Sequence, residues 1–230
     1  MKTLGLIGGT GWATTVEYYT FLNQEINRRL GGHQFARCVI YSLNFHDVVQ
    51  LMDSNMSVLP MLEDASNRLI AAGAEGLLLC ANTMHQYAEA LQKRISIPVL
   101  HVAVETANQI KKIRLSDVGL IGTRYTMEMD FFKSKLSEKG IGCVIPDEDD
   151  RLSLHTVIMD ELARGLFTET GKEQTLKIIR RLERKGIQGL ILGCTELPIL
   201  LKDVPFAYPV FDTLHIHAAA AVEFMLNPEF

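Results

Sequence analysis

A cysteine and two polar residues end an apolar run near the C-terminus of the chain. Gly189–Gly193 carries no charge, and Cys194, Thr195 and Glu196 follow it directly. Such a run predicts a buried parallel strand, and the residues after it fall at the carboxyl edge of the sheet, where open α/β sheets bind ligands. A thiolate is a competent base toward a carbon-bound proton when N–H donors or a helix N-terminus lower its pKa. We therefore expect acid–base chemistry at Cys194, against the alternative of a small buried hydrophobe.

An earlier copy of this stretch has alanine in place of the cysteine. Aligning Gly76 with Gly189 gives an offset of 113, and this offset sets Ala81 opposite Cys194. Alanine has no proton to give or take, so the two copies are chemically unequal at the position that matters most.

Three neighbours of Ala81 are candidates for the missing chemistry. Cys80 lies one residue upstream, although neighbouring side chains of an extended strand point to opposite faces. Thr83, or a water held by Thr83 and Asn82, is the alternative, but an unassisted hydroxyl is a poor base near neutral pH.

Two further strand patterns repeat at nearly the same spacing. Leu4–Gly8 returns as Val118–Gly122 at an offset of 114, and Ile97–His101 returns as Tyr208–Asp212 at an offset of 111. Three matched strands predict an α/β fold of two pseudosymmetric, Rossmann-like halves, each a parallel sheet covered by helices, with the active site in the cleft between them. We expect the first half over 1–101 plus 212–230 and the second over 102–211.

Helical periodicity fills the stretches between these strands. Thr14 and Glu17 fit a capping box, which places the start of the first helix near Thr14. Further helices are expected over about 57–72, 84–94, 127–139, 154–164 and 173–185 and after residue 212, and further strands over 36–43 and near Cys143.

Composition argues against several classes of protein. A net charge of −4 and a pI near 6.0 give no reason to expect a nucleic-acid or membrane partner, and no apolar run approaches the roughly 20 residues of a membrane span. The four cysteines form no CxxC pair, which favours reduced thiols in the cytoplasm over disulfides or zinc. The histidines show no metal-ligand spacing, and Gly8-Gly9-Thr10 is not the GxGxxG of a dinucleotide site.

Several short motifs together resemble the aspartate/glutamate racemase family. They are Leu6–Gly9, Asn82–His85, Gly122–Glu128, Gly193–Glu196 and Val210–Thr213. The chain looks most similar to the bacterial branch of broad-specificity and L-aspartate/glutamate racemases. The resemblance implies racemisation of aspartate, glutamate or a related small polar amino acid in a two-domain fold, with neither pyridoxal phosphate nor metal. It also implies a homodimer.

The resemblance assigns roles to individual residues. In this family two acid/base residues, usually both cysteines, flank the α-carbon of the substrate, and the most similar branch can use threonine for the first. Cys194 matches the second of them, whereas Ala81 stands at the first. Asn82 and Thr83 resemble anchors of the substrate carboxylate, and the other substrate-binding candidates are Gly9, Thr10, Thr123, Thr195 and Glu196.

Some of these residues also have purely structural explanations. Asn82 and Thr83 suit helix capping, and Gly9 suits a tight turn between a strand and a helix. Aspartate racemases of another branch hold the side-chain carboxylate with an Arg and a Lys. The corresponding regions here, 44–49 and 161–165, supply no matching pair, although Arg164 lies close.

Two other functions fit a chain with a single intact acid/base. One is a decarboxylase-like lyase, in which one cysteine protonates a carbanion stereospecifically. The other is an amino-acid-binding protein or an impaired racemase, since a substitution to alanine produces what Ala81 shows. Decarboxylation of a malonate-type acid favours the first, and binding without exchange of the α-proton favours the second.

Overall fold

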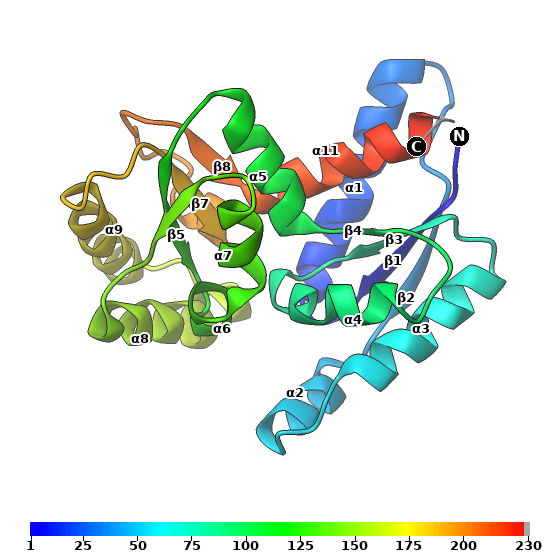
Figure 1. The fold of residues 1–230 in the computed structure, drawn as a ribbon, viewed down its shortest axis with the longest axis horizontal. Coiled ribbons are helices and arrows are strands. Elements are labelled where there is room, and N and C mark those ends of the chain that lie inside the picture. The colour runs from blue at the N-terminus through cyan, green and yellow to red at the C-terminus, as the bar shows by residue number, and fades with distance from the viewer. Residues whose placement is uncertain (228–230) are drawn as a thin grey trace. The chain divides into compact units, whose positions relative to one another are not determined.

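The chain folds into two α/β units, described for residues 1–227 by a computed structural model. The first unit comprises Met1–Val102 together with the chain from His217 onward, and the second comprises Ala103–Ile216. The chain therefore passes between the units twice, after Val102 and after Ile216 (Figure 1). None of the helices in the described residues is long and apolar enough to cross a bilayer.

The first unit is built on a four-stranded parallel sheet of order β2-β1-β3-β4. Figure 1 shows α1 and α11 on one side of this sheet and α3 and α4 on the other. Because β1 and β3 are buried along their whole length, they appear in the sequence as uninterrupted apolar runs. The elements are β1 (Leu4–Gly8), α1 (Trp12–Leu30), β2 (Cys38–Ser42), α2 (Phe45–Asp53), α3 (Leu59–Ala71), β3 (Gly76–Leu79), the 3-10 helix η1 (Asn82–Tyr87), α4 (Ala88–Gln92), β4 (Val99–Leu100) and most of α11 (Thr213–Leu226).

The second unit repeats the plan with the order β6-β5-β7-β8, again all parallel. Buried side chains from β5, β7, α8 and α9 form its core. The elements are α5 (Val102–Lys112), β5 (Asp117–Gly122), α6 (Arg124–Glu128), α7 (Asp130–Ser137), β6 (Gly142–Val144), α8 (Glu148–Thr156), the π-helix η2 (Val157–Glu161), the 3-10 helix η3 (Leu162–Arg164), α9 (Glu169–Glu183), β7 (Leu190–Gly193), α10 (Leu197–Leu200) and β8 (Val210–Asp212).

The two sheets carry the sequence repeat at the same register. Leu6 pairs with Leu78 in the first sheet, and Leu120 pairs with Ile191 in the second. These are the residues that the offsets of 114 and 113 bring together, and β3–β4 matches β7–β8 in the same way. The predicted α/β fold of two parallel-sheet halves is thus confirmed. It follows that Ala81 and Cys194 leave equivalent strands at equivalent points.

The first helix begins earlier than the sequence pattern predicts. Helix α1 starts at Trp12, its N-cap is Gly11, and no side chain caps it, so the predicted capping box at Thr14 is wrong. The neighbouring Thr15 fixes this turn instead. Its hydroxyl accepts a hydrogen bond from the Gly9 N–H at 3.1 Å and donates to the Gly11 carbonyl at 3.1 Å.

Other helices differ from their predicted forms. Helices α2 and α5 were not predicted, the helix expected over 84–94 begins as the 3-10 helix η1, and the one expected over 154–164 is divided among α8, η2 and η3. The helix expected over 127–139 is interrupted where Met129 adopts an extended conformation, with φ −73° and ψ 153°. Short-range interruptions of this kind leave the apolar periodicity almost unchanged, which is why the periodicity did not reveal them.

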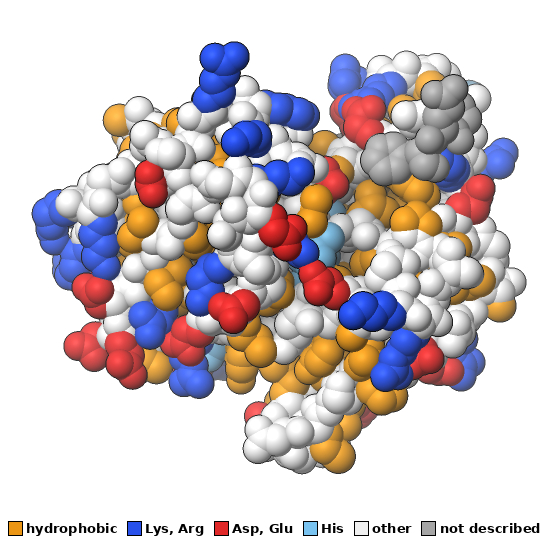
Figure 2. All heavy atoms as spheres, viewed as in Figure 1, with side chains coloured by type: hydrophobic (Ala, Val, Ile, Leu, Met, Phe, Trp, Pro, Cys, Tyr) orange, Lys and Arg blue, Asp and Glu red, His pale blue; other side chains and the backbone are white. Residues whose placement is uncertain are grey.

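Charged side chains of both signs are interspersed on the face drawn in Figure 2. Ion pairs account for part of this pattern in the second unit, where Arg181 contacts Asp150 at 2.6 Å and Lys185 contacts Asp147 at 2.7 Å. Exposed pairs of this kind contribute little stability, so the buried sheets and helices carry the fold.

Candidate functional site

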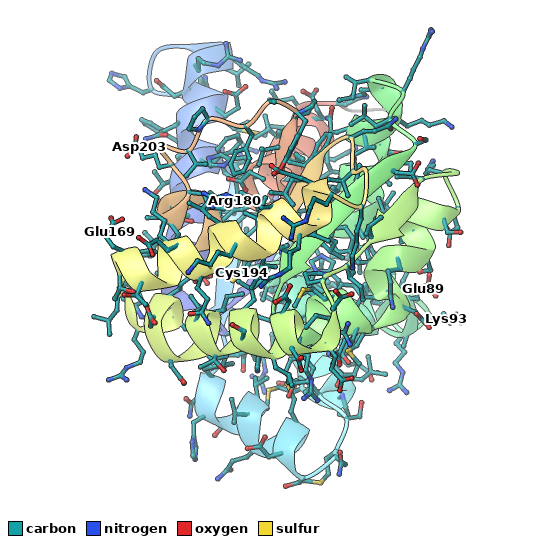
Figure 3. All side chains as sticks on the ribbon, turned by 90° about the vertical axis from the view of Figure 1, so that its left-hand side faces the viewer. Glu89, Lys93, Glu169, Arg180, Cys194 and Asp203 are labelled. Carbon is teal, nitrogen blue, oxygen red and sulfur yellow. The ribbon has the colours of Figure 1, made fainter. Side chains whose placement is uncertain are left out.

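Cys194 lies at the carboxyl end of β7, where the strand turns into a short helix. Its side chain is buried, with 8% exposure, within the core of the second unit. Figure 3 shows Cys194 near the centre of the view, whereas Glu169 and Asp203 lie at the periphery. The approach of β5 to β7 is close here, because a side chain on Gly122 would lie 2.9 Å from the Gly193 carbonyl oxygen. The thiol therefore lies next to a point where the two strands approach each other closely.

A carboxylate holds the proton of the Cys194 thiol. The Sγ–H of Cys194 donates to Oε2 of Glu196 at 3.0 Å, and the Thr195 hydroxyl donates to the same oxygen at 2.8 Å. The three polar residues that follow β7 are therefore one hydrogen-bonded group with Glu196 as its acceptor. This arrangement can move a proton between sulfur and carboxylate without any other group.

A lowered pKa, the condition for a thiolate base at Cys194, is not met in this structure. Burial raises the pKa of the thiol well above its usual value, and the charge of Glu196 and the hydrogen bond to it raise it further. Backbone N–H groups of Thr195 and Glu196 do act on the sulfur and lower its pKa, as expected, but they are outweighed. Cys194 is thus a protonated thiol, ready to act as an acid, and becomes a base only when Glu196 takes its proton.

Thr123 occupies the matching edge of the neighbouring strand β5. It is the N-cap of α6, and its hydroxyl oxygen accepts from the Thr126 N–H at 3.4 Å and lies 3.2 Å from the Thr126 hydroxyl. The Thr126 side chain is fully buried. Capping is therefore one role of Thr123. Its side chain is half-buried at the sheet edge, and its predicted role in substrate binding stays a prediction.

In the first unit, Ala81 is the N-cap of η1 and has an extended backbone, with φ −146° and ψ 132°. Asn82 and Thr83 form the first turn of η1, and all three residues are half-buried. The N-cap of this helix is Ala81, so neither Asn82 nor Thr83 occupies the capping position. The repeat sets Thr83 at the position of Glu196 and Asn82 at that of Thr195.

Cys80 is placed in the interior rather than at the sheet edge. Its side chain is 1% exposed, and its N–H donates to the Ile7 carbonyl at 2.9 Å. Burial raises the pKa of its thiol far above the usual value, with a smaller contribution from Cys38. A thiol in this setting is an inert core side chain, as the alternation along an extended strand predicts.

Gly9 is needed by the turn itself. It has φ +90°, which favours glycine, and any side chain there would collide with the backbone of Leu43. Its N–H is used by Thr15, so the substrate would have to meet another atom of this residue. Thr10, next along the turn, is half-buried, and Arg164 lies exposed at the end of η3.

Pattern analysis missed a group of histidines behind Ala81. His85 and His217 are buried, and each has its ring centroid 5.1 Å from that of its neighbour in a chain His101–His85–His217. The sequence offered no signal for this group beyond the place of His85 in the Asn82–His85 motif. The described residues contain no group of three or more His, Cys, Asp or Glu side chains arranged to hold a metal.

Fold and site together define a class of protein. It is an α/β protein of two equivalent parallel-sheet units, with a thiol–carboxylate pair at the carboxyl edge of one sheet and a threonine-bearing turn at the equivalent edge of the other.

Comparison with known proteins identifies the family. The profile of the Asp/Glu/hydantoin racemase family matches residues 7–221, and the chain belongs to that family. The crystal structure of a candidate Asp/Glu racemase from Yersinia pestis is 41% identical, with a TM-score of 0.93 and coverage of 99% of this chain and 100% of that one. An aspartate racemase homologue from Pyrococcus horikoshii is 34% identical, with a TM-score of 0.84 and coverage of 99% and 100%.

A relative of known name gives a more distant match. The glutamate racemase of Persephonella marina is 28% identical over 207 residues, which are 84% of this chain and 77% of that protein. The recognition of the family from its short motifs is therefore confirmed, and with it the general assignment to amino-acid racemases, which are isomerases.

Proposed function

We propose that the protein racemises an amino acid by proton transfer at the α-carbon, without a cofactor, and that Cys194 and Glu196 form the acid/base of one face. The observation that carries this proposal is the hydrogen bond of 3.0 Å from the Cys194 thiol to Glu196. In one direction Glu196 takes the thiol proton, and the thiolate then removes the α-proton of the substrate. In the other direction the thiol gives its proton to the α-carbanion, and Glu196 returns one to the sulfur.

The opposite face of the substrate takes its proton from water. Ala81 has no acid/base group, and the repeat sets Thr83 at the position that Glu196 has in the second unit. A water hydrogen-bonded to Thr83 and Asn82 would serve in place of the missing side chain. Because a hydroxyl-bound water is a weaker acid and base than a thiol, this face limits the rate.

The substrate is an amino acid such as aspartate, glutamate or a related small polar one. Two observations support this proposal. The chain belongs to the family, and it has half-buried uncharged donors that can hold an α-carboxylate in place while the configuration of the α-carbon is inverted. These are Asn82, Thr83, Thr123 and Thr195. Gly9, Thr10 and Glu196 complete the proposed set.

Proton NMR in deuterated water tests the reaction directly. The protein is incubated separately with L- and D-aspartate, L- and D-glutamate and several neutral amino acids, while the α-proton signal and the enantiomer ratio are followed. We expect exchange with inversion, abolished in Cys194→Ala and retained in the matched variant Cys143→Ala, whose cysteine lies on β6. Unchanged racemisation in Cys194→Ala would refute the role of this residue.

The combination of Ala81 with a protonated Cys194 favours a second candidate. A thiol that acts only as an acid on one face is what a decarboxylase-like lyase needs to protonate a carbanion stereospecifically. Release of carbon dioxide from a malonate-type acid, with no α-proton exchange on any amino acid, would establish this function in place of racemisation. Amino-acid binding with neither reaction would indicate an impaired relative.

The chain also presents a surface that suits a homodimer. Trp12, Val16 and Tyr19 lie on one stripe of α1, and their exposed fractions are 76%, 54% and 47%. An exposed apolar stripe of this kind is typical of an interface, and we propose that a second copy covers it. Light scattering of the wild type and of Val16→Glu tests this, with a monomeric wild type as the contrary result. A cytoplasmic location is proposed as well, in keeping with four free thiols.

A further inference from the structure

A buried imidazole holds the backbone of the turn that carries the alanine. Nδ1 of His85 lies 3.0 Å from the carbonyl oxygen of Ala81, and the Met84 N–H reaches the same oxygen at 3.2 Å. Because a carbonyl oxygen only accepts, the hydrogen of the neutral ring lies on Nδ1, and Nε2 is the bare nitrogen. That Nε2 is buried and has no hydrogen-bond partner among the described residues.

The surroundings of His85 are two further imidazoles. The rings of His101, just beyond β4, and His217, on α11, each have their centroid 5.1 Å from that of His85. His217 is itself fixed, because its Nε2–H donates to the Leu100 carbonyl at 2.9 Å and its Nδ1 lies 3.0 Å from the Tyr18 hydroxyl. We call His85, His101 and His217 the histidine cluster.

The cluster keeps His85 uncharged. Protonation would place a charge beside two imidazoles, in a site where His85 is 1% exposed. Burial lowers the pKa of His85 to about 3, with a further lowering by His101, and burial likewise lowers that of His217 to about 3. The titratable groups that face His85 are therefore His101 beyond β4 and His217 on α11, with Tyr18 on α1 behind His217.

The turn after β3 needs such a support. The equivalent turn after β7 is held by hydrogen bonds from Cys194 and Thr195 to Glu196, whereas Ala81 offers no side-chain donor and η1 has no side-chain cap. A short 3-10 helix has strained hydrogen bonds and is a poor support by itself. The hydrogen bond from His85 to the Ala81 carbonyl thus gives the turn a support that the alanine side chain cannot give.

We propose that His85 is a positioning residue of this site, which fixes the Ala81 carbonyl and thereby the Asn82 and Thr83 side chains that the first unit offers to the substrate. The kinetic test of this role rests on the proposed racemisation, whereas the test by NMR and hydrogen exchange does not. His85 touches no reacting atom in this scheme.

Two variants separate the hydrogen bond from the bulk of the ring. In His85→Asn the amide Nδ2 takes the place of Nδ1 and keeps the bond to Ala81, whereas His85→Leu removes the donor and fills a similar volume. We expect kcat/KM to fall about tenfold in the leucine variant and less than threefold in the asparagine variant, consistent with one neutral hydrogen bond. If the leucine variant does not fold, His85→Gln replaces it, because its amide moves to the Nε2 position.

The control is His33→Asn, at an exposed histidine after α1, for which kcat/KM should not change. Thermal unfolding of every variant accompanies the kinetics. Equal losses of activity in the asparagine and leucine variants, in proportion to their losses of stability, would overturn the proposal, because a merely structural side chain behaves in that way.

A second measurement does not depend on activity. Nitrogen-15 NMR of the histidine rings should show His85 as the neutral Nδ1–H form between pH 5 and 8, and hydrogen exchange at the Met84 amide should quicken about tenfold in His85→Leu but not in His85→Asn. An Nε2–H form would overturn the proposal. If the NMR result is as expected while the wild type racemises nothing, the proposed function fails and the positioning of the turn by His85 stands.

Discussion

The pair formed by Cys194 and Glu196 can be tested by a substitution that should slow racemisation and speed alkylation of Cys194. Glu196→Gln removes both the negative charge and the proton acceptor 3.0 Å from the sulfur. Burial remains, but the two contributions of Glu196 that raise the pKa of Cys194 disappear. The thiol pKa therefore falls, the thiolate forms more readily, and its proton has no carboxylate to receive it.

The expected magnitude follows from the type of bond. A hydrogen bond to a charged group contributes about 1.5–3 kcal/mol, which corresponds to a loss of roughly 10- to 100-fold in kcat for racemisation. Alkylation of Cys194 by iodoacetamide requires the thiolate but no proton transfer to Glu196, so at unchanged burial it should become faster near neutral pH. Loss of racemisation with gain of alkylation is the signature of this arrangement.

The assay uses a background in which the half-buried Cys38 and Cys143 are replaced by serine, and the alkylated peptide is identified by mass spectrometry. Asp203→Asn, at an exposed residue of the same unit, is the matched loss of a carboxylate and should change neither rate. Slower alkylation in Glu196→Gln, or unchanged racemisation, would refute the reasoning, because each would mean that Glu196 does not hold the thiol proton.

Three further predictions concern other parts of the chain. Ala81→Cys places a thiol at the position that the repeat matches with Cys194 and should raise kcat by about 10²-fold or more; no gain in the deuterium-exchange assay would contradict the proposed role of this position. Gly9→Ala should destabilise the protein by at least about 1–3 kcal/mol because of its positive φ and the blocking backbone of Leu43, whereas Gly32→Ala, with positive φ and open space, should cost less in urea unfolding. The two histidines with pKa near 3 bind protons below pH 6.5 only in the unfolded chain, so stability should fall from pH 6.5 toward pH 3, by on the order of 2 kcal/mol for each by pH 5. A urea midpoint independent of pH between 6.5 and 5 would contradict this.

Repeated strands made the fold predictable, because residues that match in the sequence repeat hold equivalent pairing positions in the two sheets. The offsets of 114 and 113 in the sequence became the pairs Leu6–Leu78 and Leu120–Ile191 in the sheets. Helix ends were predicted less well. The capping box at Thr14 failed because the neighbouring Thr15 takes the hydrogen bonds of that turn, and nothing in a pattern of apolar residues distinguishes these two threonines.

The place of Cys194 at the end of a strand was predictable, whereas its protonation was not. Cys194 follows an apolar run, so its place at the sheet edge could be read from the sequence. Its pKa depends on the balance between burial and Glu196 on one side and backbone N–H groups on the other, and that balance requires coordinates. His85 was overlooked because an isolated histidine without metal spacing carries no signal until its bond to Ala81 is seen.

The last helix of each repeat belongs to the unit formed by the other repeat, and this has a consequence for folding. Helices α5 and α11 follow the equivalent strands β4 and β8, yet α5 from Ala103 onward belongs to the second unit and α11 from His217 onward belongs to the first. The two repeats have exchanged their final helices, as subunits of a swapped dimer do. Two separate half-length chains could exchange their last helices in the same way. Fragments 1–113 and 114–230 should therefore be poorly folded when made singly and should complete each other when mixed, since each carries the helix that the other lacks.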